Sequence, residues 1–95
     1  MNQDGWHYFL KLCMGTKSEM VLSELFELLL TPEEKTGMET RCLIIKELLD
    51  KQKNQRQMSA DLNVSIAKIT RGSNELKKRS PELLRYLHAQ YNDAT

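Results

Sequence analysis

Positive charge is concentrated in one segment of this 95-residue chain, residues 51–79. The segment contains eight lysines and arginines against two acids, a net charge of +6, whereas the rest has six basic and eleven acidic residues, net −5. Basic side chains neutralise nucleic-acid phosphates, and this neutralisation supplies most non-specific DNA affinity. The distribution indicates a surface that meets a polyanion, although a solvated charged face is the plain alternative.

Catalytic and metal-binding chemistry has little support in the sequence. Cys13 and Cys42 lack CxxC spacing, and His7 and His88 are isolated near opposite ends of the chain. We therefore expect free, buried thiols, no metal site and no enzyme activity. No apolar run approaches the roughly 20 residues of a membrane span, and the first residues are not typical of a signal peptide, so we expect a cytoplasmic protein without membrane contact.

The elements that position the basic segment are all predicted to be helices. An apolar stripe at helical spacing runs through Trp6, Phe9, Leu10, Cys13 and Met14. The next helix, within residues 18–30, has too wide an apolar arc for one small monomeric core and favours a helical dimer. We expect one all-α domain of about six helices, with residues 1–53 for dimerisation, 54–78 as a helix-turn-helix and 80–92 as the last helix.

A long helix is predicted to begin at Pro32. Thr31 suits the N-cap, proline suits the first helical position, and Glu34 completes a capping box. The expected apolar stripe, which runs to about Asp50, consists of Met38, Cys42, Ile45, Leu48 and Leu49.

Two short helices and a tight turn follow in the basic segment. Asn54, with Gln57 as reciprocal partner, and Ser65 suit the two N-caps, and Asn63 suits a left-handed turn. Small Ser59 stands where the helices would approach. We expect inward side chains at Met58, Leu62, Ile66, Ile69 and Leu76, and, in a last helix starting at Ser80-Pro81, at Leu83, Leu84, Leu87 and Tyr91. The spacing predicts a helix-turn-helix, and its charge favours DNA binding over simple scaffolding.

The motifs ITRGSN (residues 69–74), LLLTPEE (28–34), TR (40–41) and KELLD (46–50) resemble the tryptophan repressor family. The resemblance extends over residues 21–91 without an obvious gap. It implies an intertwined all-helical homodimer that binds double-stranded operator DNA when L-tryptophan, as corepressor, occupies two pockets. Genes of tryptophan metabolism would be controlled in this way.

The resemblance also implies the residues of the corepressor pocket. Arg41 and Arg71 would lie on either side of the indole, and Arg71 could pair with the ligand carboxylate. Gly72 would let the ligand lie against the helix backbone, although close helix packing is an alternative reason for a glycine there. The other subunit would supply Thr31 and the backbone carbonyls of Leu28 and Leu30.

The DNA-reading positions follow by the same alignment. Arg56 matches a direct base reader, since its guanidinium can present two donors to guanine. Ser65, Ile66 and Ala67 lie where the recognition helix would enter the major groove. Thr70 and Lys77 match phosphate contacts, and Lys68 adds charge where the family commonly has a small hydroxyl residue.

Glu75 departs from the family pattern, which has a serine that meets the ligand ammonium. A carboxylate at this position could bind the ammonium more strongly or pair with Arg71 one turn earlier. Two other classes stay open: a helix-turn-helix regulator that responds to another ligand or none, and a helical protein-interaction module.

Overall fold

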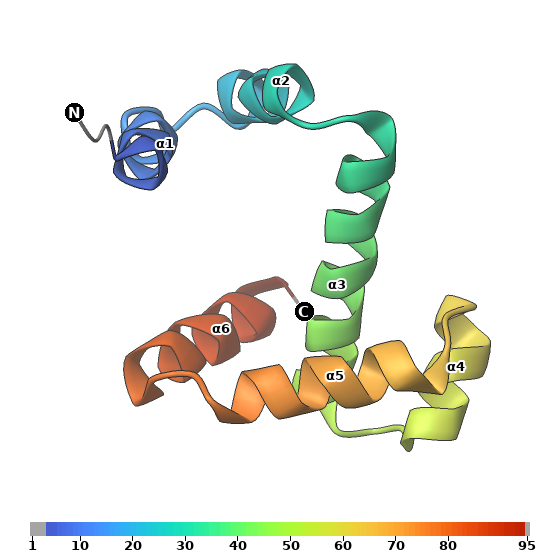
Figure 1. Ribbon diagram of the computed structural model, residues 1–95. Helices are drawn as coiled ribbons and strands as arrows, with labels where there is room; N and C mark the ends of the chain where they lie inside the picture. The colour runs from blue at the N-terminus through green and yellow to red at the C-terminus, as the bar shows by residue number, and fades with distance from the viewer. Residues whose placement is uncertain (1–3, 95) are drawn as a thin grey trace. The chain divides into compact units, whose positions relative to one another are not determined.

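The computed structural model describes residues 4–94, with side chains to residue 93. Within this range the chain is all-α, as predicted, and contains six helices and no strand. Figure 1 labels them in chain order. Their bounds are α1 Gly5–Met14, α2 Glu19–Leu29, α3 Pro32–Asp50, α4 Gln55–Leu62, α5 Ile66–Lys77 and α6 Pro81–Ala94.

The chain divides into two compact units, one ending at Thr36 and one beginning at Gly37. In the N-terminal unit, Phe9 of α1 contacts Phe26 of α2 with ring centroids 5.7 Å apart, and Trp6 lies 5.2 Å from Phe9. Large apolar side chains stay exposed on α2, including Met20 at 79% and Leu28 at 80%. Part of the wide apolar arc of α2 is thus exposed.

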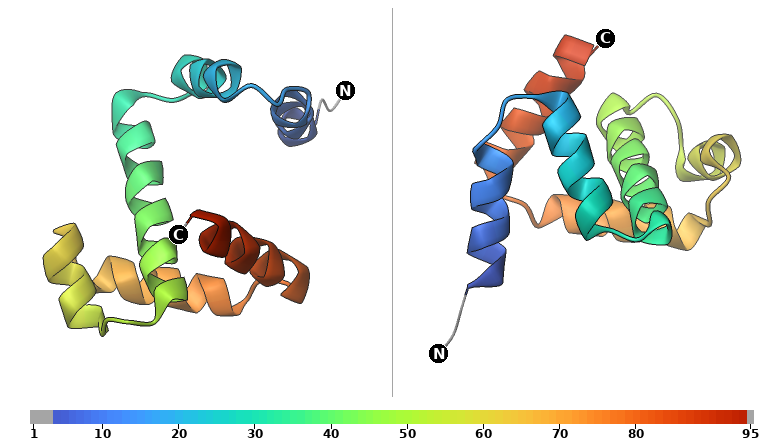
Figure 2. Two further views of the ribbon diagram at one scale, coloured as in Figure 1. Left: turned by 180° about the vertical axis from the view of Figure 1, so that it is seen from behind. Right: turned by 90° about the horizontal axis from the view of Figure 1, so that it is seen from above.

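In the second unit, α5 runs across the C-terminal part of α3 (Figure 1). The view from behind in Figure 2 gives the same arrangement, with α4 near the start of α5 and α6 beyond its end. Local signals set the starts of these helices. Thr31 and Glu34 form the predicted capping box of α3, with bonds of 2.9 and 3.1 Å, and the hydroxyl of Ser80 accepts a bond from the Leu83 amide at the start of α6.

The core of the second unit joins α3, α4 and α5. Its buried members among the described residues are Ile44 (2% exposed), Met58 (4%) and Ile69 (0%), and Leu48, Leu62 and Val64 pack against them. The predicted stripe of α3 omitted Ile44, because α3 has two apolar faces. Ile44 and Leu48 face the helix-turn-helix, whereas Cys42, Ile45 and Leu49 line a pocket beside α6.

The burial predicted for Ile66, Leu83 and the two thiols was wrong. Ile66 is 46% exposed because it occupies the first turn of α5, one turn before the buried Ile69. Leu83, at 38%, lines the open pocket rather than a closed core. Both thiols are free, as predicted, but Cys42, which lines the open pocket, is exposed, and Cys13 is only half-buried.

Gly72 lies where α5 meets α3. A Cβ atom added there would be 3.0 Å from Cγ2 of Ile44 and 3.7 Å from Cδ1 of Leu48. Close packing between the two helices therefore accounts for the glycine without any ligand. A glycine within a helix costs about 1 kcal/mol relative to alanine, and the close packing of α5 on α3 offsets this cost.

Polar contacts connect the C-terminal end of α3 to neighbouring elements. In the link after α3, Lys53 Nζ lies 2.7 Å from Asp61 Oδ2 and 3.4 Å from Glu47 Oε1. The hydrogen bond to Asp61 raises the pKa of Lys53 above its ordinary value. The Tyr91 hydroxyl donates to Asp50 Oδ1, which ties α6 to the end of α3 and raises the pKa of Tyr91.

Candidate nucleic-acid interface and ligand pocket

The helix-turn-helix is built from local signals that the sequence makes visible. Asn54 and Gln57 form a reciprocal capping box at the start of α4 with bonds of 2.8 and 2.9 Å. Asn63 ends α4 in the left-handed conformation, at φ 54° and ψ 49°. Ser65 Oγ then accepts a bond from the Lys68 amide and starts α5. These confirmed caps set α4 and α5 three residues apart.

A side-chain bond stabilises the turn itself. Ser59 Oγ donates to the carbonyl of Val64 over 2.5 Å, and the Val64 amide donates to the Ser59 carbonyl over 3.1 Å. Ser59, the small residue predicted where the two helices approach, thus also forms hydrogen bonds with the turn. With Met58 and Ile69 buried behind it, the pair of helices forms a fixed unit.

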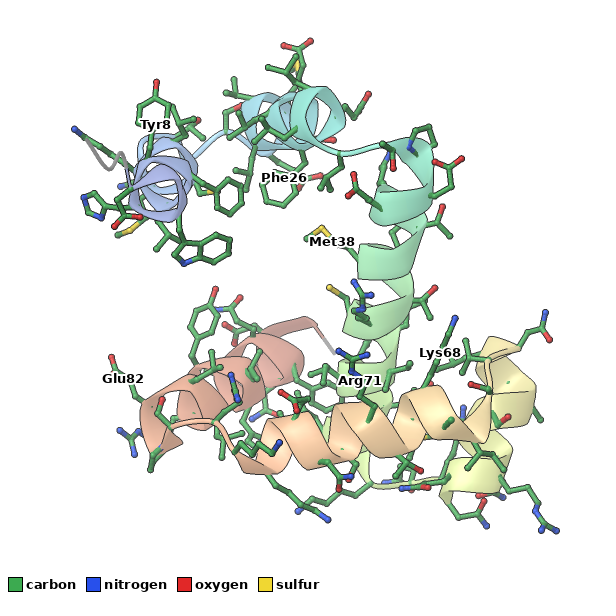
Figure 3. The ribbon with its side chains drawn as sticks, in the orientation of Figure 1. Tyr8, Phe26, Met38, Lys68, Arg71 and Glu82 are labelled. Carbon is green, nitrogen blue, oxygen red and sulfur yellow. The ribbon has the colours of Figure 1, made fainter. Side chains whose placement is uncertain are left out.

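All residues predicted to contact DNA are exposed. Lys68 and Arg71 emerge on the same side of α5 in Figure 3, as expected for positions three apart on a helix. Exposure leaves these side chains accessible to a groove or to phosphates. The predicted set is Arg56 on α4, Ser65 at the cap, and Ile66, Ala67, Lys68, Thr70 and Lys77 on α5.

A hydrogen bond between the two helices was not predicted. Thr70 Oγ1 donates to Gln55 Oε1 over 3.0 Å, and both groups are near the surface. Only the oxygen of the Gln55 side-chain amide takes part in this bond, so the amide NH2 group can still donate to another partner. No sequence signal identifies this pair, because fifteen residues separate its members and only the packing of α4 on α5 brings them together.

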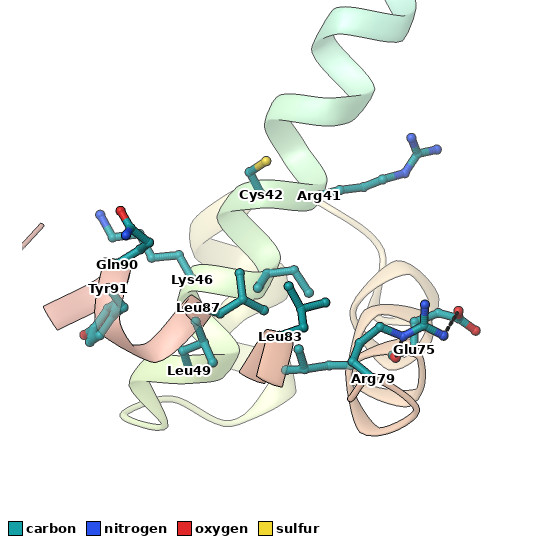
Figure 4. Close-up of a pocket in the computed structure, with 12 residues that line it drawn as sticks. Arg41, Cys42, Lys46, Leu49, Glu75, Arg79, Leu83, Leu87, Gln90 and Tyr91 are labelled. Atoms are coloured by element: carbon teal, nitrogen blue, oxygen red, sulfur yellow. Dashed lines mark hydrogen bonds and ion pairs between the residues drawn. The ribbon is translucent and has the colours of Figure 1, made fainter. Parts of the chain in front are cut away.

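A largely apolar pocket of about 500 Å³ lies between α3, α5 and α6. Its floor includes Ile45, Leu49, Leu76, Leu83 and Leu87. Figure 4 shows the leucines converging from α3 and α6, while Arg41 extends away from them. A concave apolar surface with a few polar groups at its edge is the usual form of a site for an organic ligand.

The edge of the pocket carries three cations and one acid: Arg41, Lys46 and Arg79 with Glu75. Glu75 Oε2 lies 3.2 Å from Lys78 Nζ, and Glu75 Oε1 lies 3.7 Å from an Arg79 terminal nitrogen, the second contact being marked in Figure 4. The hydrogen bond from Lys78, with the charges of Lys78 and Arg79, holds the pKa of Glu75 below its ordinary value. Glu75 is therefore ionised at neutral pH.

Two of the residues predicted for the ligand site, Arg41 and Glu75, line this pocket, whereas Arg71 and Gly72 are not among its lining residues. Arg71 is exposed one turn before Glu75, and Gly72 packs on α3. Glu75 makes ion pairs with Lys78 and Arg79, and the charge of Arg71 is the smallest of the effects that lower the Glu75 pKa. Leu28, Leu30 and Thr31 belong to the N-terminal unit, and their assignment to a partner's pocket stays a prediction.

Other kinds of site find no basis in the part of the chain that the structure describes. Between residues 4 and 94, no group of three or more His, Cys, Asp or Glu side chains could hold a metal ion. No helix in the same range is long and apolar enough to cross a membrane.

Comparisons with known proteins agree with the helical architecture. A family profile described as "Trp repressor protein" matches residues 4–91. A Trp operon repressor homolog of Chlamydia caviae is 41% identical over 97% of this chain and 94% of its own length. A homolog with the same description from Pasteurella multocida is 36% identical over 97% of this chain and 90% of its own length. Another, from Chlamydia trachomatis serovar D, is 39% identical over 93% of this chain and 94% of its own length. The chain belongs to the Trp repressor protein family.

Proposed function

We propose that this protein is a transcriptional repressor, without enzyme activity, that binds operator DNA as a homodimer when L-tryptophan occupies its pocket. The genes of tryptophan metabolism would be its targets. The observation that carries the proposal is the helix-turn-helix, in which every residue predicted to meet DNA is exposed while Met58 and Ile69 fix the helices from behind.

The DNA-binding part of the proposal depends on α5 and its surroundings. The N-terminal end of α5, with Ser65, Ile66 and Ala67, would enter the major groove, and Arg56 on α4 would bind guanine through two donors. Lys68, Thr70 and Lys77 would contact phosphates. The hydroxyl proton of Thr70 is engaged in the hydrogen bond to Gln55. Thr70 would therefore have to break this bond before it could donate to a phosphate.

The ligand part of the proposal depends on residues of α3 and α5. L-tryptophan would place its indole between Arg41 and Arg71, since guanidinium planes stack favourably on aromatic rings. Its charged groups would meet Arg71 and Glu75. Thr31 and the carbonyls of Leu28 and Leu30 from the partner subunit would complete the site.

Homodimer formation is supported by apolar surface that one chain leaves open. The exposed apolar side chains of α2 form such a surface. A chain of this size buries only about 60 to 65% of the surface that its unfolded form exposes, so association adds a needed core. We propose that the dimer is intertwined and that the protein acts in the cytoplasm.

Differential binding is the proposed mechanism of control. Tryptophan between α3 and α5 would set the two helix-turn-helix units of the dimer about 34 Å apart, the distance between successive major grooves. A shift from 1% to 99% competent protein requires about 5.5 kcal/mol of differential affinity, which two ligands per dimer would share. Without ligand the helices would be set incorrectly for DNA.

A selection from random duplex DNA tests the proposal without knowledge of the operator. Rounds of binding with L-tryptophan present are expected to enrich a sequence with two inverted half-sites. Parallel rounds without L-tryptophan are expected to enrich nothing. Enrichment of the same site in both series would favour a regulator that needs no ligand, and enrichment in neither would favour a protein-interaction module.

A further inference from the structure

Lys53, in the link between α3 and α4, contacts both helices at once. Its ammonium nitrogen lies 2.7 Å from Asp61 Oδ2 in the last turn of α4 and 3.4 Å from Glu47 Oε1 in the last turn of α3. The side chains of these three residues, the Lys53 cluster, are 24 to 52% exposed, and Glu47 is the least exposed of them. One side chain therefore connects the end of α3 with the end of α4.

Among the described residues, α4 is attached to α3 by a small set of contacts. The main partner of α4 is α5, and α4 reaches α3 through Met58 in the core that includes Ile44. The link of residues 51–54, which leaves the end of α3 in Figure 1, is not helical and contains a left-handed residue, Lys51 at φ 59°. Such a link does not by itself fix the angle between two helices, so the ion pairs of Lys53 add a restraint on how α4 tilts relative to α3.

The Lys53 cluster contacts α4 on a face that does not carry Arg56. Asp61 follows Arg56 by five residues, and at 3.6 residues per turn such positions point about 140° apart around a helix. Arg56 stays exposed and accessible to DNA. Lys53 can therefore affect the direction in which Arg56 points without occupying the surface that meets DNA.

Direct contact with a phosphate is the alternative role for Lys53, since it belongs to the basic segment. Two carboxylates already bind its ammonium group, and a phosphate would have to displace Asp61 from a contact of 2.7 Å. Asp61 separates the two roles experimentally. Its removal takes away a negative charge that repels DNA, so electrostatics alone predict tighter binding, whereas loss of the contact with Lys53 predicts weaker binding.

We propose that Lys53 is a positioning residue for DNA recognition, whose ion pairs with Glu47 and Asp61 set the orientation of α4 and so direct Arg56 toward the operator. This inference rests on the proposed function, since it concerns how the helix-turn-helix is presented to DNA. Loss of the cluster lowers the fraction of protein in which α4 is correctly oriented. The apparent affinity for the operator falls by the same factor.

Two substitutions of opposite charge test this inference on the full-length protein with L-tryptophan present. Lys53→Gln removes a cation, Asp61→Asn removes an anion, and both break the same contact. We expect each to weaken binding to the duplex enriched in the selection described above about threefold. The double variant should also lose about threefold rather than about ninefold, because residues that share one contact are not additive. Affinity for an unrelated duplex of the same length should stay unchanged or rise in Asp61→Asn.

Lys51→Gln is the matched control, because it removes one cation from an exposed position of the same link. Its ratio of affinities for the selected and the unrelated duplex is expected to stay as in the parent. Partial loss of folding would weaken binding to both duplexes equally and leave that ratio unchanged. Binding of the selected duplex by Asp61→Asn as tight as that of the parent, or tighter, overturns this inference alone. A selection that enriches no duplex with L-tryptophan present overturns the proposed function and this inference together.

Discussion

Gly72 lies so close to Ile44 that a Cβ atom added to Gly72 would be 3.0 Å from Ile44 Cγ2, a tight contact that Ile44 would relieve only by moving a few tenths of an ångström. Ile44 is 2% exposed and belongs to the core between α3 and α5. The contact fixes how closely these two helices approach. The distance between the core helix and the recognition helix therefore depends on a residue without a side chain.

Gly72→Ala is expected to destabilise the protein by about 1 kcal/mol. Overpacking costs about 1 to 3 kcal/mol, and the better helix propensity of alanine returns about 1 kcal/mol. Gly37→Ala is the matched control, because a Cβ atom there meets only the Arg41 guanidinium, at 3.8 Å, and the change should stabilise α3. Urea unfolding at one fixed protein concentration compares the two. Equal stabilisation by both changes would contradict the packing role of Gly72.

Asn63 is expected to be replaceable by glycine but not by alanine. Its φ of 54° is left-handed, a conformation that costs an ordinary residue about 1 to 2 kcal/mol. We expect the free energy of unfolding of Asn63→Gly to lie within about 0.5 kcal/mol of the parent value and that of Asn63→Ala to be lower by about 1 kcal/mol. Thermal or urea unfolding measures both. If Asn63→Ala proves as stable as Asn63→Gly, the turn does not require this conformation.

Lys53 is expected to contribute stability that disappears at high pH. The hydrogen bond to Asp61 raises its folded-state pKa above the ordinary value of 10.5. A raised lysine pKa means that the contribution is fully present below pH 10.5 and is lost as the pH rises through the folded-state pKa. Denaturation curves of the parent and Lys53→Gln should therefore differ at pH 8 and converge above pH 10.5.

The matched control for Lys53 is Lys77→Gln, which changes the same residue type at an exposed position of α5. Its stability at pH 8 should lie within about 0.5 kcal/mol of the parent. A gap between the parent and Lys53→Gln that widens with rising pH would show that the contact with Asp61 is not its source.

Two substitutions are expected to separate phosphate contact from base contact, if the proposed function holds. Lys68→Ala should weaken binding similarly on all sequences and reduce the salt slope of the binding constant by about 1. Arg56→Ala should reduce the preference for the operator by about 1 to 3 kcal/mol. Exposed Arg85 on α6 provides the control, Arg85→Ala. Identical salt slopes for Lys68→Ala and Arg85→Ala would remove Lys68 from the phosphate contacts.

The sequence predicted the parts of the fold that depend on neighbours in the chain. The caps at Thr31, Asn54 and Ser65 and the left-handed Asn63 each depend on residues no more than three positions away, so their signals are readable. Burial depends on other helices. Ile44 and Ile45 look alike in sequence, but the first faces the helix-turn-helix and the second faces the pocket.

The candidate site was only partly predictable for the same reason. The exposed residues of α4 and α5 follow from helical periodicity and from the resemblance to the family. The bond between Thr70 and Gln55 and the hold of Arg79 on Glu75 depend on how α4 packs on α5 and how the chain leaves α5. For Glu75 the pattern offered the ligand ammonium or Arg71 as partner, and it gave no sign of the ion pairs with Lys78 and Arg79.

The dissociation constant for the selected operator, measured at one salt concentration with and without L-tryptophan, tests the central proposal most directly. A change from about 1% to about 99% competent protein corresponds to binding about 100-fold tighter with the ligand, and this is the predicted result. The same affinity in both titrations would contradict control by L-tryptophan.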